Sequence, residues 1–231
     1  MASYALRSVG SMGVVAVAAA MLLMPSARAG VTSSSQINAY WVGGSTASDL
    51  VSFMRNRPFH GDRGDAVANI RPSYALSVTG KQAGSACRAS DVNLKVRFVI
   101  TIPRARNAGG MSPATRAAWN GFVAFATRHE NQHKSIYLQC ANDFVARAMR
   151  MTAASCFALS ANVRSQFEAA KRACDKRQLA FDRQDYGRVT GLSLFAMAGS
   201  PGRKVVKARP TSPVARVIPV SAPGTGLIGP R

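Results

Sequence analysis

The residues of this chain best suited to chemistry are His129, Glu130 and His133, which spell His-Glu-x-x-His within one helix-patterned stretch. Two histidines four residues apart project from the same face of a helix, so both can bind one Zn²⁺ ion. The glutamate between them lies beside the metal, where it can take a proton from an activated water molecule. The spacing therefore predicts a zinc site with His129 and His133 as ligands and Glu130 as the general base.

The stretch that carries this motif predicts one long helix from Pro113 to about Met151, with Ser112 as its N-cap. A single histidine on the apolar face of a helix is more often a hydrogen-bonded core residue than a ligand. Two histidines on that face, with a glutamate after the first, favour a metal. Residues recurring every three or four positions form the buried stripe, namely Trp119, Phe122, Ala126, His129, His133 and Cys140.

A second helical pattern runs from about Leu159 to Arg183 and predicts an antiparallel hairpin with the first helix. The chain has four cysteines, which can pair in three ways, and spacing alone does not choose between them. If the turn is centred near residue 156 or 157, Cys140 falls opposite Cys174. That register predicts a Cys140–Cys174 disulfide and leaves Cys87 to pair with Cys156.

The same register brings Asp182, Asp185 and Tyr186 within reach of the two histidines. A catalytic zinc ion normally has three protein ligands and one open position, so one more ligand is needed. We expect Asp182 or Asp185 to supply it. Tyr186 is a rarer kind of ligand and is also suited to donating a hydrogen bond to a reaction oxyanion. The alternative for all three is a solvated, charged helix end.

The remaining pattern predicts an α+β domain. Residues 37–42, 66–78 and 92–102 read as strands, because apolar and polar residues alternate along them, and residues 46–54 read as a short helix. We expect a small, mainly antiparallel sheet packed on the long His-Glu-x-x-His helix and on the antiparallel C-terminal helix. This domain spans residues 36–191, after a short linker at 30–35.

Both ends of the chain read as segments outside the domain. Arg7, the apolar run Val14–Met24 and Ala27-Arg28-Ala29 have the order of a secretory signal peptide, so we expect residues 1–29 to be removed. Four cysteines in an exported chain predict two disulfides and a periplasmic or extracellular protein. Residues 192–231 form a basic tail, rich in proline and glycine, that we expect to be disordered.

The formal net charge of +20 indicates attraction to polyanions. In an exported protein the accessible polyanions are envelope surfaces, which the basic tail is suited to contact. The basic segments lack the interleaved aromatic residues that stack on bases, which argues against a specific nucleic-acid reader.

Several segments together resemble a known bacterial family. They are the run Tyr40 to Gly44, the strand end Thr101-Ile102-Pro103, the helix from Trp119 to His133, and Phe181-Asp182 followed by Gly187. The family is described as predicted secreted Zn-dependent proteases and has long been catalogued as a domain of unknown function. The resemblance covers about Gln36 to Gly191. Members often carry an aromatic-Asp pair and then His-Gly, whereas Tyr186-Gly187 stands at that place here.

The motif and this resemblance imply an exported zinc-dependent hydrolase. We expect it to act on peptide or protein substrates as a metalloprotease, with water activated by zinc and Glu130. The alternative, from another class, is a non-catalytic cationic envelope-binding protein with a structural metal site. A zinc amidase or peptidase acting on cell-wall peptides is a third possibility. Loss of Glu130 separates the first two, because only a catalytic site needs a general base.

Overall fold

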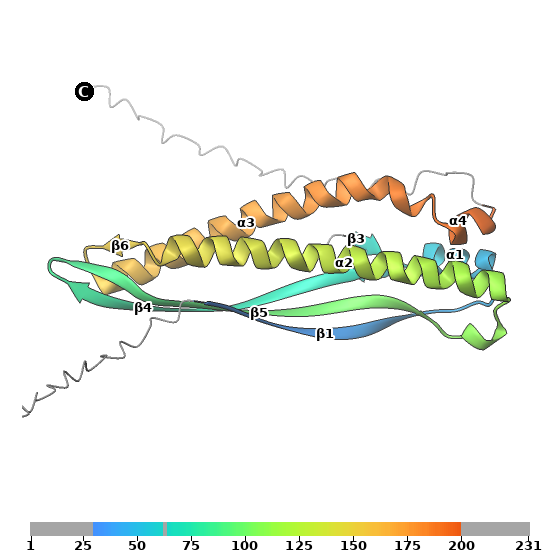
Figure 1. Cartoon of the computed structure of the whole chain (residues 1–231), viewed down its shortest axis with the longest axis horizontal. Coiled ribbons are helices and arrows are strands. Elements are labelled where there is room, and N and C mark those ends of the chain that lie inside the picture. Colours follow the sequence, from blue (N-terminus) through green and yellow to red (C-terminus); the bar gives the residue numbers. More distant parts are fainter. Residues whose placement is uncertain (1–29, 62–63, 200–231) are drawn as a thin grey trace, which may run out of the picture.

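The computed structural model describes residues 30–61 and 64–199 (Figure 1). The expected signal peptide and most of the expected basic tail lie outside the described residues. Two layers run along an elongated molecule, with long strands on one side and long helices on the other. Among the described residues, no helix is both long enough and apolar enough to cross a membrane.

The main sheet has four strands in the order β1-β5-β4, with the short β6 pairing with β5. β4 and β5 form an antiparallel hairpin that turns at Gly84, whose φ of 62° suits glycine. β1 lies parallel to β5 on the other side. The strands are β1 (Gly30–Val42), β4 (Asn69–Ala83), β5 (Ala86–Ala105), β6 (Thr152–Ala153) and a separate pair, β2 (Phe59–Gly61) with β3 (Gly64–Ala66).

One face of this sheet carries the long helices, as expected (Figure 1). The helix α2 begins after the N-cap Ser112 with a proline in its first turn, and α3 begins after the N-cap Ser155. The fold class predicted from the sequence is therefore confirmed: a mainly antiparallel sheet packs on long helices. The helices are α1 (Ala47–Asn56), η1 (Ala108–Gly110), α2 (Pro113–Ala148), α3 (Cys156–Val189) and α4 (Ser193–Met197).

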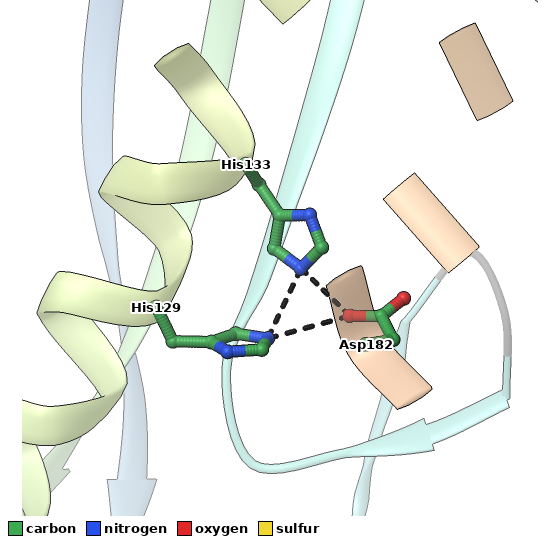
Figure 2. A group of neighbouring side chains, drawn as sticks. All are labelled: His129, His133 and Asp182. Atoms are coloured by element: carbon green, nitrogen blue, oxygen red, sulfur yellow. Dashed lines mark hydrogen bonds and ion pairs between the residues drawn. The ribbon is translucent and has the colours of Figure 1, made fainter. Parts of the chain in front are cut away.

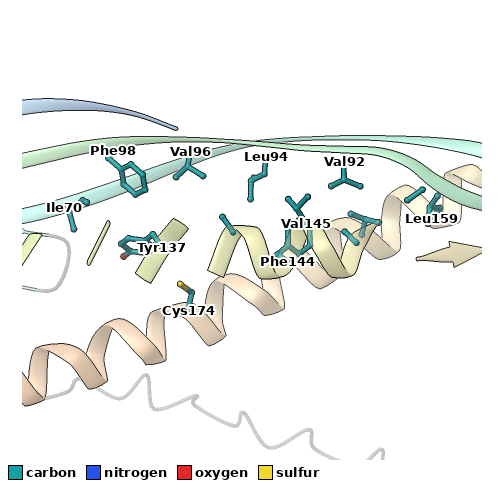
Figure 3. Packing of buried hydrophobic residues seen from close by; sticks show 14 of the residues in the cluster. Ile70, Val92, Leu94, Val96, Phe98, Tyr137, Phe144, Val145, Leu159 and Cys174 are labelled. Carbon is teal, nitrogen blue, oxygen red and sulfur yellow. The ribbon is translucent and has the colours of Figure 1, made fainter. Parts of the chain in front are cut away.

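Two apolar clusters hold the layers together. In the larger one, alternate residues of β5, including Leu94, Val96 and Phe98, pack against Tyr137 and Phe144 of α2 (Figure 3). The smaller cluster lies at the other end of α2. It joins α1, the first turns of α2 and α4 through residues such as Leu50, Trp119, Phe122 and Leu194. The helix α2 therefore contributes to both cores.

Both disulfides predicted from the hairpin register are confirmed. Cys140 and Cys174 join α2 to α3, and Cys87 and Cys156 join β5 to the start of α3. Gly80 of β4 lies against the second of these, because a Cβ atom at this position would stand 2.6 Å from the Cys87 sulfur. Only glycine therefore fits beside this disulfide without displacement.

Several boundaries differ from those expected. The strands expected at residues 66–78 and 92–102 span Asn69–Ala83 and Ala86–Ala105. The first strand begins at Gly30 instead of residue 37, so residues 30–35, expected as a linker, are strand. Their serine-rich sequence lacks an apolar alternation because this edge strand is largely exposed. The helix α3 continues to Val189 instead of Arg183, and α4 lies within the expected tail. Leu194 of α4 is fully buried, so the packed structure extends past residue 191.

Candidate metal centre

Three side chains from α2 and α3 converge on one point (Figure 2). The Nε2 atoms of His129 and His133 lie 3.0 Å apart. An Asp182 oxygen, Oδ1, lies 2.8 Å from Nε2 of His133 and 3.4 Å from Nε2 of His129. Donor atoms that bind one tetrahedral zinc ion lie about 3.3 Å from each other. These three residues therefore form a group that could hold a metal ion of that size.

Gln178 of α3 fixes the orientation of the His133 ring. Its side chain is fully buried, with 0% exposed. Its Nε2 donates to the His133 carbonyl oxygen at 3.1 Å, and its Oε1 lies 2.5 Å from His133 Nδ1. Because a carbonyl only accepts, the amide nitrogen must face it, and the amide oxygen must then accept a proton from Nδ1. This leaves the lone pair of His133 on Nε2, which faces the convergence point.

Asp185 does the same for His129. Its Oδ2 lies 2.7 Å from His129 Nδ1, and its Oδ1 accepts from Arg188 at 3.1 Å. Burial alone would raise the pKa of Asp185, but the hydrogen bonds from His129 and Arg188 outweigh burial and lower that pKa. The ionised carboxylate keeps a proton on Nδ1, so His129 also presents its lone pair through Nε2. Such partners commonly orient histidine ligands of metals.

Two ring lone pairs and a carboxylate thus face one another at hydrogen-bond distance, an arrangement that a cation would stabilise. A proton on His129 satisfies it in part. Burial lowers the pKa of His129, but hydrogen bonds to Asp182 and Asp185 and the charge of Glu130 outweigh burial and raise that pKa overall. A divalent metal balances the same group more fully, because all three donors can bind it at once. The donor set of two imidazoles and one carboxylate is ordinary for zinc.

Aromatic rings hold the ligands in place. The His129 ring lies between Phe181 and Phe125, with ring centroids 4.9 Å and 6.2 Å away and both pairs stacked. The edge of Phe181 also meets His133, at 4.9 Å. Apolar walls of this kind restrict the ring rotamers and lower the local polarity, which strengthens electrostatic contacts.

Glu130, expected as a general base, follows the first histidine on α2. Its side chain is buried, with 4% of the residue exposed. Its negative charge contributes to the raised pKa of His129, which places it within electrostatic reach of that ring. The motif therefore provides a carboxylate within electrostatic reach of His129 as well as the two imidazoles.

The other expected site residues have different outcomes. Asp182 joins the two histidines, as predicted. Asp185 was expected as a ligand, but it contacts the opposite nitrogen of His129 and orients the ring instead. Tyr186 belongs to α3, and its side chain lies outside the part of the chain that the structure describes. Glu168 pairs with Lys171 on an exposed surface of α3.

Sequence reasoning missed Gln178, Phe125 and Phe181. The signal available was helical spacing, because residues 178, 182 and 185 recur at intervals of four and three and so share one face of α3. Once Asp182 is placed opposite His133, this spacing puts Gln178 on the same face. The spacing does not reveal that a glutamine is buried in an otherwise charged helix.

The Cys140–Cys174 disulfide sets the register of these contacts. Cys140 lies two helical turns beyond His133 on α2, and Cys174 lies about one turn before Gln178 on α3. A covalent link at this place prevents the helices from sliding past each other. Asp182 therefore meets the histidines rather than the turns before or after them.

Comparison with known proteins gives a family but no activity. No curated protein and no solved structure matches the chain. The family described as "Bacterial protein of unknown function (DUF922)" matches residues 37–188, which include both helices and every residue of the convergence point. This agrees with the expectation of a bacterial domain of unknown function, and the description assigns no chemistry. The chain therefore belongs to the DUF922 family of bacterial proteins.

Proposed function

We propose that the protein is an exported zinc-dependent hydrolase and that it cleaves peptide bonds as a metalloprotease. The observation that carries this proposal is the orientation of the two histidines. Gln178 and Asp185 hold the outer ring nitrogens, so that both Nε2 lone pairs point with Asp182 at one position. A buried glutamate follows the first histidine on the same helix.

The number and exposure of the ligands favour a catalytic site over a structural one. Three protein ligands leave a fourth tetrahedral position open, whereas structural zinc sites are usually closed by four. The side chains of Asp182 and His129 are 35% and 21% exposed. Solvent and a substrate can therefore approach the group from one side, while His133 is held on the buried side.

In this proposal each residue has one role. A zinc ion held by His129, His133 and Asp182 would supply a Lewis acid that polarises a carbonyl group and makes water more acidic. Glu130 takes the proton from the attacking water and later gives it to the leaving amine. Gln178 and Asp185 keep the imidazoles in the neutral tautomer that can bind a metal.

Export is supported by the two disulfides, because disulfides persist in oxidising compartments and are rare in the cytosol. The signal-peptide pattern of residues 1–29 agrees with this location. An exported zinc peptidase would meet peptides and proteins outside the cytoplasm, and those are the proposed substrates.

The test measures metal and activity in the same samples. Full-length wild type, His133→Ala and Glu130→Gln are loaded with zinc, desalted and analysed by metal mass spectrometry, and each is assayed with a quenched-fluorescent peptide library. We expect one zinc per chain in wild type and Glu130→Gln, none in His133→Ala, and cleavage only in wild type. Zinc bound with no cleavage in wild type would support the structural-metal alternative. No zinc in wild type would overturn the enzyme proposal.

A further inference from the structure

The opposite face of the sheet carries none of the long helices among the described residues (Figure 1). The side chains of β5 alternate, so that Leu94, Val96 and Phe98 face the helices while Lys95 and Arg97 point to the other side. None of the described helices covers that side (Figure 1). We call this surface the outer sheet face. It is defined here by the outward residues of β4 and β5 from Arg71 to Arg97, together with Thr32 and Ser34 of β1.

The outer sheet face is strongly basic. Lys95 and Arg97 are exposed and make no salt bridge with any described residue. Further along, Lys81 of β4 and Arg88 of β5 stand directly opposite each other. Like charges in such a pair destabilise a sheet, so this arrangement costs stability that a bound anion would restore. The charged residues at outward positions are Arg71, Lys81, Arg88, Asp91, Lys95 and Arg97.

The middle of the outer sheet face is hollowed. A hollow of about 420 Å³ lies where Thr32 and Ser34 of β1, Ser73 of β4, and Lys95 and Arg97 of β5 meet. These residues lie side by side, because Lys95 pairs with Thr32 and Arg97 pairs with both Ser34 and Ser73. Hydroxyl groups therefore flank Arg97 on both sides and Lys95 on the β1 side, whereas Ala75 is the β4 partner of Lys95. Lys95 and Arg97 are two residues apart, which places them roughly 6.7 Å apart along the strand.

We propose that the outer sheet face binds an extended sugar polymer that carries phosphate groups. The cations complement phosphates, with arginine able to form paired hydrogen bonds to them. The serine and threonine hydroxyls are suited to the hydroxyl groups of the sugars. Gln36 of β1 adds an amide to the same row, since it accepts from Arg97 Nη2 at 2.8 Å.

The same surface is poorly suited to nucleic acid. Binding of single strands normally uses aromatic rings on which the bases stack. The one ring near the hollow belongs to Tyr74, which packs edge-on against Phe167 of α3, on the helix side of the sheet. Among the described residues, the hollow therefore offers charge and hydroxyl groups but no stacking platform.

The test uses the full-length chain and a charge-matched control. The probe is the phosphorylated core oligosaccharide of a lipopolysaccharide, freed of its lipid, and neutral dextran and a single-stranded oligonucleotide serve as comparisons. Dissociation constants are measured for wild type, Lys95→Gln/Arg97→Gln and the control Arg164→Gln/Lys176→Gln. The control removes the same charge from exposed positions of α3.

We expect the Lys95→Gln/Arg97→Gln variant to bind the oligosaccharide at least roughly tenfold more weakly, because hydrogen bonds from charged groups to phosphates are stronger than those between neutral groups. The control should bind within about twofold of wild type, since distant exposed charges are screened by salt. Equal loss in both variants, or no loss in either, would overturn the proposal. Tighter binding of the oligonucleotide than of the oligosaccharide, lost in the same variant, would overturn it in favour of nucleic acid.

Discussion

The two halves of the contact between α2 and α3 use different kinds of interaction. Near the turn, Leu159 and Val163 of α3 are fully buried against the apolar core, and Phe167 packs on Phe144 of α2. Beyond the Cys140–Cys174 disulfide, the buried described side chains of α3 are Gln178 and Asp185, and both contact the histidines. One half is held by apolar packing and the other by polar contacts around the candidate metal centre.

Because of this difference, we expect the stability of each half to respond to different perturbations. Apolar burial stabilises the first half without direct dependence on metal or on pH. The polar groups of the second half surround the candidate metal position, so we expect its stability to depend on metal and on pH. The disulfide lies between the halves and connects them.

The largest effect on stability is expected from a cavity in the apolar half. Phe144→Ala removes a buried ring and should lower the free energy of unfolding by about 3–5 kcal/mol. Phe157→Ala is the matched control, since Phe157 is 86% exposed, and it should stay within about 0.5 kcal/mol of wild type. Urea unfolding measures both. The zinc affinity of folded Phe144→Ala should remain within about twofold, and a larger loss would contradict the separation of the halves.

Removing each disulfide in turn distinguishes an effect on helix register from an effect on overall stability. Replacing Cys140 and Cys174 by serine should cost about 2–4 kcal/mol, and replacing Cys87 and Cys156 should cost a similar amount, because each closes a long loop. Only the first pair fixes Gln178 and Asp182 opposite the histidines. We therefore expect zinc affinity to fall in the Cys140→Ser/Cys174→Ser protein alone, by competition with a fluorescent chelator. Equal zinc affinity in both proteins would show that the disulfide does not set the register.

A smaller and more local effect is expected from Gln178→Leu. The leucine fills the buried space but cannot accept from His133 Nδ1, so the ring loses its fixed tautomer. Zinc affinity should fall about 10–100-fold, which is the usual cost of losing a partner that orients a metal ligand. Gln166→Leu, at an exposed position of α3 nearer the turn, is the control and should leave the affinity unchanged. Chelator competition on folded protein checks both.

The smallest effect concerns pH. The pKa of His129 is raised in the folded protein, so its protonated form adds stability below the unfolded value of about 6.5. Without metal, that stability is lost as pH rises through the folded pKa. With zinc bound the slope reverses, because protons compete with the metal for the same nitrogens. Thermal unfolding between about pH 5 and 8, with and without zinc, should give opposite slopes; parallel slopes would contradict a metal at this place.

A site residue was easier to predict when the residues that define its position lie close together in the sequence. His129, Glu130 and His133 lie within five residues of one helix, so their proximity depends on helix geometry alone. Asp182 is about fifty residues away, and it could be placed because the hairpin has one turn and Cys140 pairs with Cys174. Local geometry and one long-range constraint were therefore sufficient for the metal group.

What was missed depends on surroundings that a single sequence does not display. Residues 30–36 are strand because β5 offers them an unpaired edge, not because they alternate. Asp185 and Asp182 are chemically alike, and only the orientation of the His129 ring decides which of them faces the metal position. Leu194 is buried because α4 folds back on α1 and α2, a contact for which residues 192–198 carry no distinct signal.

The length of α2 has a consequence for how the molecule opens. At 36 residues, α2 is about 54 Å long, and its two ends are embedded in separate apolar cores. His129 and His133 lie near its middle. A helix that frays from its ends opens last in this region. Backbone amides around them should therefore be the slowest in α2 to exchange with deuterium. The spacing of the histidines is kept by the part of the helix that opens least, so a metal ion would leave by movement of α3.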